Sequence, residues 1–223
     1  DGLDDLTVGG RDKYGSPSGR VWLYVGPFSG HHSSADADLA LSSSTSGSYL
    51  GMEARGVAGL GDADGDGLAD LLIGGYWDTT EAYAGGAAWV VSGTNRGDQD
   101  ATAIAMAMVF GETESSYVGA DVAAPGDVDG DGTDDVWIAA PGYNANGASS
   151  GSGLLFYGPM TGTNLIADAD ARFDGPEPGA YLGAVGAAGD VDGDGLADLA
   201  VSARTVDLGS AGDSGAVLIF RGP

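Results

Sequence analysis

The sequence repeats one nine-residue pattern of aspartate and glycine, and no other feature constrains its fold as strongly. The pattern is Asp-x-Asp-Gly-Asp-Gly-x-x-Asp, and it occurs at residues 62–70, 127–135 and 190–198. The chain also opens on the second half of a fourth copy, Asp1-Gly2-Leu3-Asp4-Asp5. When the copies are aligned on the fifth position of the pattern, they lie 65, 65 and 63 residues apart. A spacing of this kind indicates a repeat protein in which each repeat carries the same loop.

The residue types in the pattern predict a calcium loop. Positions 1, 3, 5 and 9 supply carboxylates, which repel one another unless a hard cation lies between them, and calcium accepts about six to eight oxygen ligands. The glycine at position 6 allows a sharp turn at positive φ, so that position 7 can offer its backbone carbonyl. The predicted ligands are Asp62, Asp64, Asp66, Leu68 and Asp70; Asp127, Asp129, Asp131, Thr133 and Asp135; and Asp190, Asp192, Asp194, Leu196 and Asp198.

The half-copy at the start of the chain predicts a fourth, incomplete site at Asp1, Leu3 and Asp5. Asp-Gly clusters are also common in ordinary turns, but three full copies in matching context favour metal sites. A flexible cage of four carboxylates suits calcium better than the smaller magnesium ion. Zinc and copper prefer His and Cys, and the chain has two adjacent His and no Cys.

The residues after each loop exclude an EF-hand. That motif needs Glu at position 12 and flanking helices, whereas position 12 here is Ile73, Ile138 or Val201. Each loop leads into a short apolar run that ends in small residues, which is typical of a buried strand.

Each repeat contains four strand-like segments and no convincing helix. They are the stretch from Tyr-x-Gly to the loop, the apolar run after it, a third apolar run such as 87–91, and a fourth segment at 37–41, 105–110 or 166–173. Four antiparallel strands in about 64 residues, repeated radially, predict an all-β fold built of β-propeller blades. A linear solenoid is the alternative, but its repeats are usually shorter.

The order of these motifs closely resembles the FG-GAP repeat. Tyr-x-Gly is followed by Gly-Asp-x-Asp-Gly-Asp-Gly-x-x-Asp, an apolar run ending in Ala139-Ala140-Pro141, and Gly-x-Val-x-x-Phe. FG-GAP repeats build the propeller of integrin α subunits and of bacterial integrin-like proteins. The resemblance implies that the calcium loops join strands 1 and 2 of each blade on one rim. This chain departs from the motif at Gly74-Gly75 and Ser202-Ala203, and Tyr replaces the motif's Phe.

When the chain is divided into blades according to the FG-GAP motif, it accounts for part of a propeller. Residues 1–46 supply strands 2–4 of a blade, 47–114 and 115–176 two complete blades, and 177–223 strands 1–3 of another. These 14 strands amount to about half of a seven-bladed ring. The two ends would expose unpaired strand edges. We therefore expect the ring to be completed by a second copy, as a homodimer, or by the remainder of a parent protein.

The negative charge of the chain disfavours some classes of binding partner. The formal net charge is −25, and the loop positions with Asp1 and Asp5 hold 14 of the 33 acidic residues. Such acidity disfavours binding to nucleic acid and to anionic membranes. No apolar run reaches the roughly 20 residues of a membrane span. Because the chain has no initiator Met or signal peptide, we expect a processed piece, and calcium loops of this kind indicate an extracellular or cell-surface location.

The sequence predicts a binding module and not an enzyme. By strand parity, the loops between the second and third strands lie on the face opposite the calcium loops, where the integrin-like family binds ligands. The candidate ligand-face residues are the aromatics Tyr14, Tyr76, Trp77, Tyr83 and Tyr143. We expect a protein or glycan ligand and a structural role for calcium. The alternatives are the accessory or catalytic propeller of a secreted hydrolase or lyase, and a purely architectural module. The segment 147–151 matches a nucleophile-elbow pattern but lies in a loop between two expected strands.

Overall fold

A computed structural model shows an all-β fold, as the sequence predicts. It describes residues 3–10, 19–45, 47–52, 56–64, 66–207, 212 and 214–222. Sixteen strands lie in these ranges, together with one short α-helix and two single turns of 3₁₀-helix. Within the described ranges, no helix has the length and apolar character needed to cross a membrane.

The strands form four sheets, numbered here in chain order. Sheet 1 has the order β1-β2-β3-β7, sheet 2 β12-β8-β6-β5-β4, sheet 3 β13-β11-β10-β9, and sheet 4 β14-β15-β16. The strands are β1 (Leu6–Gly10), β2 (Arg20–Tyr24), β3 (Leu39–Ser42), β4 (Val57–Leu60), β5 (Asp70–Gly75), β6 (Ala87–Val91), β7 (Gly97–Asp100), β8 (Ala107–Phe110), β9 (Val122–Gly126), β10 (Asp135–Ala140), β11 (Ser152–Phe156), β12 (Gly162–Leu165), β13 (Ala171–Asp174), β14 (Leu182–Gly189), β15 (Asp198–Ala203) and β16 (Ala216–Phe220).

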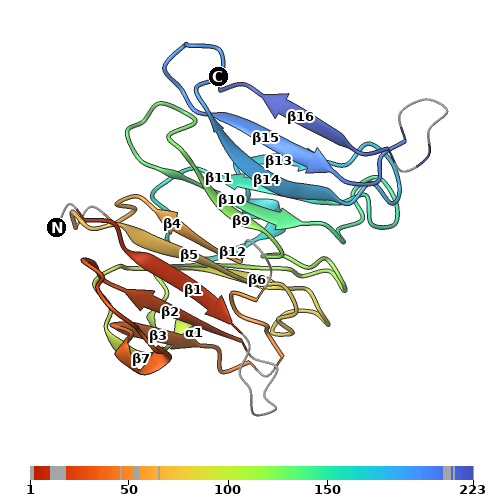
Figure 1. Ribbon diagram of the computed structural model, residues 1–223. Helices are drawn as coiled ribbons and strands as arrows, with labels where there is room; N and C mark the ends of the chain where they lie inside the picture. The colour runs from red at the N-terminus through yellow and green to blue at the C-terminus, as the bar shows by residue number, and fades with distance from the viewer. Residues whose placement is uncertain are drawn as a thin grey trace.

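The sheets follow one another through the molecule like successive propeller blades. Figure 1 shows them in chain order, from strands β1, β2 and β3 of sheet 1 in red and orange to sheet 4 in blue. In chain order, β4, β9 and β14 are the first strands of sheets 2, 3 and 4. β9 packs against both β4 and β14. The four sheets form an open series and not a closed ring.

Two strands were not expected from the sequence. β7 pairs in parallel with β3, and β12 pairs in parallel with β8. In the chain, β7 lies between β6 and β8 of sheet 2 but pairs with sheet 1, and β12 lies between β11 and β13 of sheet 3 but pairs with sheet 2. Each of the two strands therefore joins one sheet to the next. Sheets 1 and 2 are therefore not purely antiparallel, because a connection of irregular sequence supplies an extra edge strand.

The helical structure in the described residues is limited to three short turns. α1 (Ala101–Ile104) and the 3₁₀ turns η1 (Ser34–Asp36) and η2 (Ile166–Asp168) each precede an outer strand. The Asp100 side chain accepts the N–H groups of Thr102 and Ala103, which satisfies free donors at the start of α1. The outer strands therefore begin later than predicted, at residues 39, 107 and 171.

Two of the first strands also begin later than predicted. Tyr49 and Tyr117 have φ of 56°, so the chain turns at the Tyr-x-Gly motif instead of extending. β4 then starts at residue 57 and β9 at residue 122. Tyr181 turns the chain in the same way, with φ of 48°, but β14 starts directly after it, at Leu182.

The hydrophobic core is three layers, each between two consecutive sheets. Alternate residues of one strand serve two layers: Leu71 and Ile73 of β5 pack toward sheet 1, whereas Leu72 packs toward sheet 3. Every residue of β5, β6, β10 and β11 is buried. Continuous apolar strands are buried because sheets cover both of their faces.

Candidate metal centres

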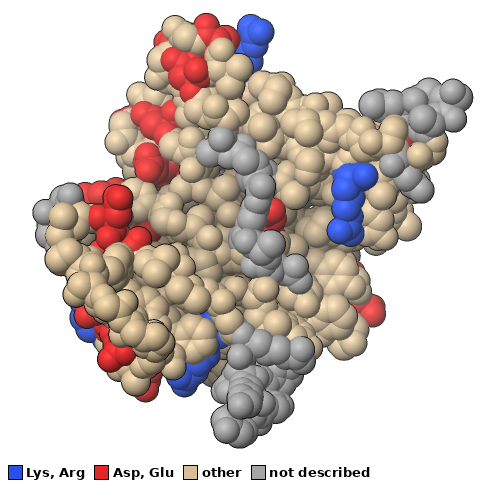
Figure 2. All heavy atoms as spheres, in the orientation of Figure 1, with Lys and Arg blue, Asp and Glu red and all other residues tan. Residues whose placement is uncertain are grey.

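The three complete Asp-Gly loops connect the first and second strands of sheets 2, 3 and 4. Loop 62–70 joins β4 to β5, loop 127–135 joins β9 to β10, and loop 190–198 joins β14 to β15. Because strands flank every loop, none of them is an EF-hand. Figure 2 shows Asp and Glu side chains gathered along the left edge of the view, where these loops lie in Figure 1.

The backbone of each loop curls around its own carboxylates in the same way. The Oδ2 atom of position 1 accepts the N–H of the position 6 glycine at 2.9 Å in all three loops. The Oδ1 atom of position 3 accepts the N–H of position 5 at 3.0–3.3 Å. The position 6 glycines have φ of 89°, 94° and 96°, so the predicted positive φ is confirmed.

This curl brings three carboxylates of each loop together. The grouped residues have oxygen atoms within 4.8 Å of one another; they are Asp62, Asp64 and Asp66; Asp127, Asp129 and Asp135; and Asp190, Asp192 and Asp194. The remaining predicted carboxylates, Asp70, Asp131 and Asp198, lie in the same loops but outside these groups. The position 7 residues Leu68, Thr133 and Leu196 donate their N–H groups to the position 5 carboxylate. A ring of carboxylate oxygens fits a hard divalent cation such as calcium.

Of the predicted incomplete site, Asp1 lies outside the described residues. Leu3 is 52% exposed. The Oδ1 atom of Asp5 accepts the N–H of Gly26 at 2.9 Å, so Asp5 occupies the same place as the position 9 residues of the complete loops.

The position 9 carboxylate acts as a clamp, a role that the sequence analysis missed. Its Oδ2 atom accepts the N–H of position 2 at 2.7–2.8 Å in each loop. Its Oδ1 atom accepts, at 3.0 Å, the N–H of the glycine that follows the third strand; these glycines are Gly93, Gly158 and Gly222. The loop, the second strand and the end of the third strand are thereby held at one buried carboxylate. The glycine that recurs after each third strand was the sequence feature from which this contact could have been predicted.

The three clamps differ in electrostatics. Burial raises the pKa of Asp70 and of Asp135 above the ordinary value, because the charged form loses water. The pKa of Asp198 is instead lowered, first by the hydrogen bond from the Val191 N–H and then by that from Gly222. Burial opposes this shift at Asp198, but its effect is smaller than that of the two hydrogen bonds.

The residue before the clamp glycine faces the loop and differs between sheets. The Ser92 hydroxyl lies 3.4 Å from Asp66 Oδ2. The pKa of the Tyr157 hydroxyl is raised by burial and then by the charge of Asp129. Arg221 Nη1 lies 3.3 Å from Asp192 Oδ2. Arg221 thus places a positive charge beside the third loop, where the first two loops have Ser92 and Tyr157.

Three of the predicted ligand-face aromatics meet in one cluster at the end of the sheets opposite the loops. Tyr76, Trp77 and Tyr83 lie in the β5–β6 connection. Tyr76 and Trp77 contact each other and both Tyr49 and Tyr117, and Tyr83 contacts Trp77, at centroid distances of 5.5–6.3 Å. These five residues are called the aromatic cluster below. Tyr49 and Tyr117 were missed because they belong to the Tyr-x-Gly motif, which was interpreted only as a strand start.

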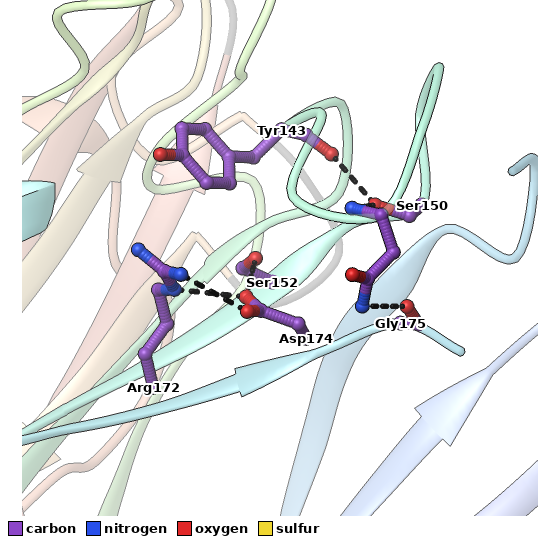
Figure 3. A network of polar contacts seen from close by, with 7 residues as sticks. Tyr143, Ser150, Ser152, Arg172, Asp174 and Gly175 are labelled. Atoms are coloured by element: carbon purple, nitrogen blue, oxygen red, sulfur yellow. Dashed lines mark hydrogen bonds and ion pairs between the residues drawn. The ribbon is translucent and has the colours of Figure 1, made fainter. Parts of the chain in front are cut away.

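Tyr143 lies apart from the aromatic cluster, and Tyr14 lies outside the described residues. Figure 3 shows Tyr143 beside Arg172, whose guanidinium carbon lies 5.5 Å from the ring centroid. Arg172 is held by Asp174 through two hydrogen bonds of 2.9 and 3.0 Å, and the Ser152 hydroxyl donates to the same carboxylate. The ring of Tyr143 also packs on the core between sheets 2 and 3, so part of its role is structural.

The nucleophile-elbow pattern at 147–151 lies between two strands, β10 and β11, where such a motif requires a strand and a helix. The hydroxyl of Ser150 accepts the Asn146 N–H and donates to the Tyr143 carbonyl. The central residue of the pattern, Ser149, donates its N–H to Asn144 Oδ1. The segment is therefore a hydrogen-bonded loop.

The comparison with protein families supports the motif-based resemblance. A family model described as FG-GAP repeat matches residues 182–220, the span from β14 to β16 that contains the third loop. No curated protein matches the chain. This match is consistent with the integrin-like FG-GAP family. The chain is thus an all-β protein of propeller-like sheets that contains an FG-GAP repeat.

Proposed function

We propose that this protein is a calcium-stabilised, integrin-like propeller module that binds a protein or glycan outside the cell or at its surface. The observation that carries the proposal is a group of three carboxylates, with oxygens within 4.8 Å of one another, in the loop between the first and second strands of each of three sheets. FG-GAP repeats are typical of extracellular and cell-surface proteins, which supports the location.

In this proposal calcium has a structural role. Without a cation the grouped carboxylates repel one another, and a bound ion would hold the turn between the first and second strands. With dissociation constants of about 10⁻⁴–10⁻³ M and millimolar calcium, each site contributes roughly 0.4–1.4 kcal/mol by mass action. Three sites together are a large share of a typical domain's stability.

Thermal unfolding tests the calcium role directly. We expect the melting temperature to be higher in 2 mM calcium than in EGTA by at least ~2 °C, because three sites contribute at least about 1.2 kcal/mol and about 1 kcal/mol shifts Tm by roughly 2–4 °C in a chain of this size. Asp129→Asn should reduce the calcium-dependent gain, whereas Asp98→Asn, which removes the same charge from β7, should preserve it. Equal melting curves in calcium and EGTA would contradict the structural role.

The aromatic cluster supports the binding role. Its rings lie on the end of the sheets opposite the candidate metal centres, and Tyr83 is 62% exposed. Exposed Tyr and Trp side chains commonly anchor protein and glycan ligands. Binding to glycan and protein arrays should be lost in Trp77→Ala. The matched control is Phe28→Ala, an exposed aromatic in the connection after β2, which should leave binding unchanged. If Trp77→Ala binds every array ligand as the parent protein does, the cluster is not the ligand face.

The proposal also includes completion of the ring by further propeller strands, from a second copy or from the rest of a parent protein. The open series of sheets supports it, because edge strands with unpaired backbone groups are usually covered in native proteins. Mass measurement in calcium tests whether a second copy is involved.

A further inference from the structure

Asp134 belongs to loop 127–135, but its side chain reaches the neighbouring loop 62–70, and it is not one of the predicted ligands. It stands at position 8 of its loop, directly before the clamp Asp135. Its Oδ2 atom accepts the N–H of Gly61 at 3.1 Å, across 73 positions of the chain. A Cβ atom on Gly61 would clash with the same carboxylate oxygen, so glycine allows this close approach. The contact links the loop of sheet 3 to the end of β4 in sheet 2.

Gly61 is the residue at which loop 62–70 closes. Its carbonyl oxygen accepts the N–H of Asp70, the clamp of that loop, at 3.2 Å. The next residue in the chain is Asp62, a member of the grouped carboxylates. The hydrogen bond to Asp134 therefore restrains the backbone that places position 1 of loop 62–70.

The position of Asp134 depends in turn on the curl of its own loop. On one side, Thr133 donates its N–H to Asp131 Oδ1 at 2.8 Å. On the other side, the clamp Asp135 accepts two backbone N–H groups, at 2.8 and 3.0 Å. Thr133 and Asp135 are both predicted ligands of one candidate metal centre. The carboxylate that holds Gly61 is thus mounted between two residues of the neighbouring centre.

The other complete loops have no such side chain at position 8, which is Ala69 in the first loop and Ala197 in the third. The N–H of Ala197 donates to the carbonyl oxygen of Asp127 at 3.2 Å, so position 8 also meets position 1 of the preceding loop there. That contact joins neutral backbone groups. Asp134 instead supplies a charged acceptor, and hydrogen bonds to charged groups are the stronger kind. Coupling between loops should therefore be largest between sheets 2 and 3.

We propose that Asp134 is a positioning residue for the candidate metal centre of loop 62–70 and couples that centre to loop 127–135. The inference rests on the proposed function, because it concerns sites that bind calcium. When loop 127–135 is filled, its curl holds Asp134 still, and the carboxylate holds Gly61 and Asp62 in place. Loop 62–70 is then ordered in advance, so its own filling costs less conformational entropy. Such coupling is reciprocal, so filling either loop raises the affinity of the other.

Calcium titrations followed by NMR test the coupling on the full chain. The amides of Gly67 and Gly132 report loops 62–70 and 127–135 separately. The variant Asp129→Asn weakens loop 127–135 and makes no contact with the other loop. We expect it to lower the calcium affinity measured at Gly67 by about 2–10-fold, the range of one hydrogen bond.

Variants of Asp134 separate positioning from charge. Asp134→Ala should lower the calcium affinity at Gly67 and abolish the effect of Asp129→Asn on it, as in a double-mutant cycle. Asp134→Asn keeps an acceptor oxygen for the Gly61 N–H and should retain most of the coupling. Asp98→Ala removes the same charge from β7 and is the control. Hydrogen exchange in EGTA is a metal-free readout, in which the Gly61 amide should exchange faster in Asp134→Ala than in Asp134→Asn.

Two results would overturn the coupling and leave the proposed function standing. One is a Gly67 titration that Asp129→Asn does not change. The other is a loss of affinity that is equal in Asp134→Ala and Asp134→Asn, because the charge of the carboxylate would then account for it. A chain in which neither the Gly67 nor the Gly132 amide responds to calcium would overturn the proposed function, and the coupling with it.

Discussion

Loops 127–135 and 190–198 have nearly the same sequence and the same internal hydrogen bonds, yet their surroundings differ. The clamp of loop 127–135 is Asp135, which belongs to sheet 3, between sheets 2 and 4, and its pKa is raised. The clamp of loop 190–198 is Asp198, which belongs to sheet 4, the last described sheet, and its pKa is lowered. The strand that each clamp holds is buried in one case, β11, and exposed in the other, β16. The curl of the loop is therefore a local property, whereas its electrostatics and its contribution to stability depend on the neighbouring sheets.

The largest difference should appear when the clamps are removed. Asp135→Ala leaves the N–H groups of Val128 and Gly158 without their acceptor in a buried place, which costs about 1–3 kcal/mol for each donor. Asp198→Ala should cost less, because its donor Val191 is 60% exposed and can turn to water for a partner, whereas Val128 is 4% exposed. Thermal unfolding in EGTA measures both variants without a metal contribution, and the exposed loop variant Asp66→Ala is the control. Equal losses for the two clamps would contradict the role of the neighbouring sheet.

The clamp glycines provide a second, steric comparison. A Cβ atom on Gly158 would lie 2.5 Å from the Asp134 carbonyl oxygen, whereas one on Gly222 would first meet the Leu196 side chain at 2.9 Å. Because the contact at Gly158 is the closer of the two, Gly158→Ala should destabilise the fold by about 1–3 kcal/mol and Gly222→Ala by less. Gly59→Ala, whose added methyl would meet nothing within 4 Å, is the control. Urea unfolding at constant slope checks the order, and a Gly222 variant as unstable as the Gly158 variant would refute it.

Arg221 should distinguish the two loops in ion binding. Removing its charge in Arg221→Gln takes a cation away from Asp192 and should raise the calcium affinity of loop 190–198 by about 1.5–5-fold, the range of an exposed ion pair. The amide signals of Gly195 and Gly132 in an NMR calcium titration report the two loops separately. The Gly132 titration should not change. A Gly195 titration that is also unchanged would show that Arg221 does not influence the site.

The smallest effect concerns pH in the metal-free protein. Asp70 and Asp135 have raised pKa values, so their contribution to stability is complete below the unfolded value of about 3.9 and is lost as the pH rises through the folded value. Asp198 has a lowered pKa, so its contribution is present above the unfolded value and is lost as the pH falls through the folded value. Carboxyl carbon NMR between pH 2 and 7 should show Asp135 titrating at higher pH than Asp198. The reverse order would contradict the effect of burial.

Much of the local structure was predictable from residue types. The glycines at position 6 predicted the positive φ, and the apolar runs after each loop predicted the buried strands β5 and β10. The predictions failed where distant contacts override local pattern. Tyr49 and Tyr117 were expected to begin strands, but each turns the chain so that the next residue bridges to Gly19 or Gly86 of the preceding sheet. The parallel strands β7 and β12 were also missed, because their polar sequences pair only where a neighbouring sheet offers an edge.

By itself, the sequence determined the repeat, the carboxylate loops and the all-β class, because each depends on residues close together in the chain. Only the tertiary structure decided which aspartate is a clamp, which aromatics form one cluster, and which apolar strand is left uncovered. Those properties depend on burial and contact between segments tens of residues apart. Three loops of almost the same sequence therefore differ in the direction in which the pKa of the clamp carboxylate is shifted.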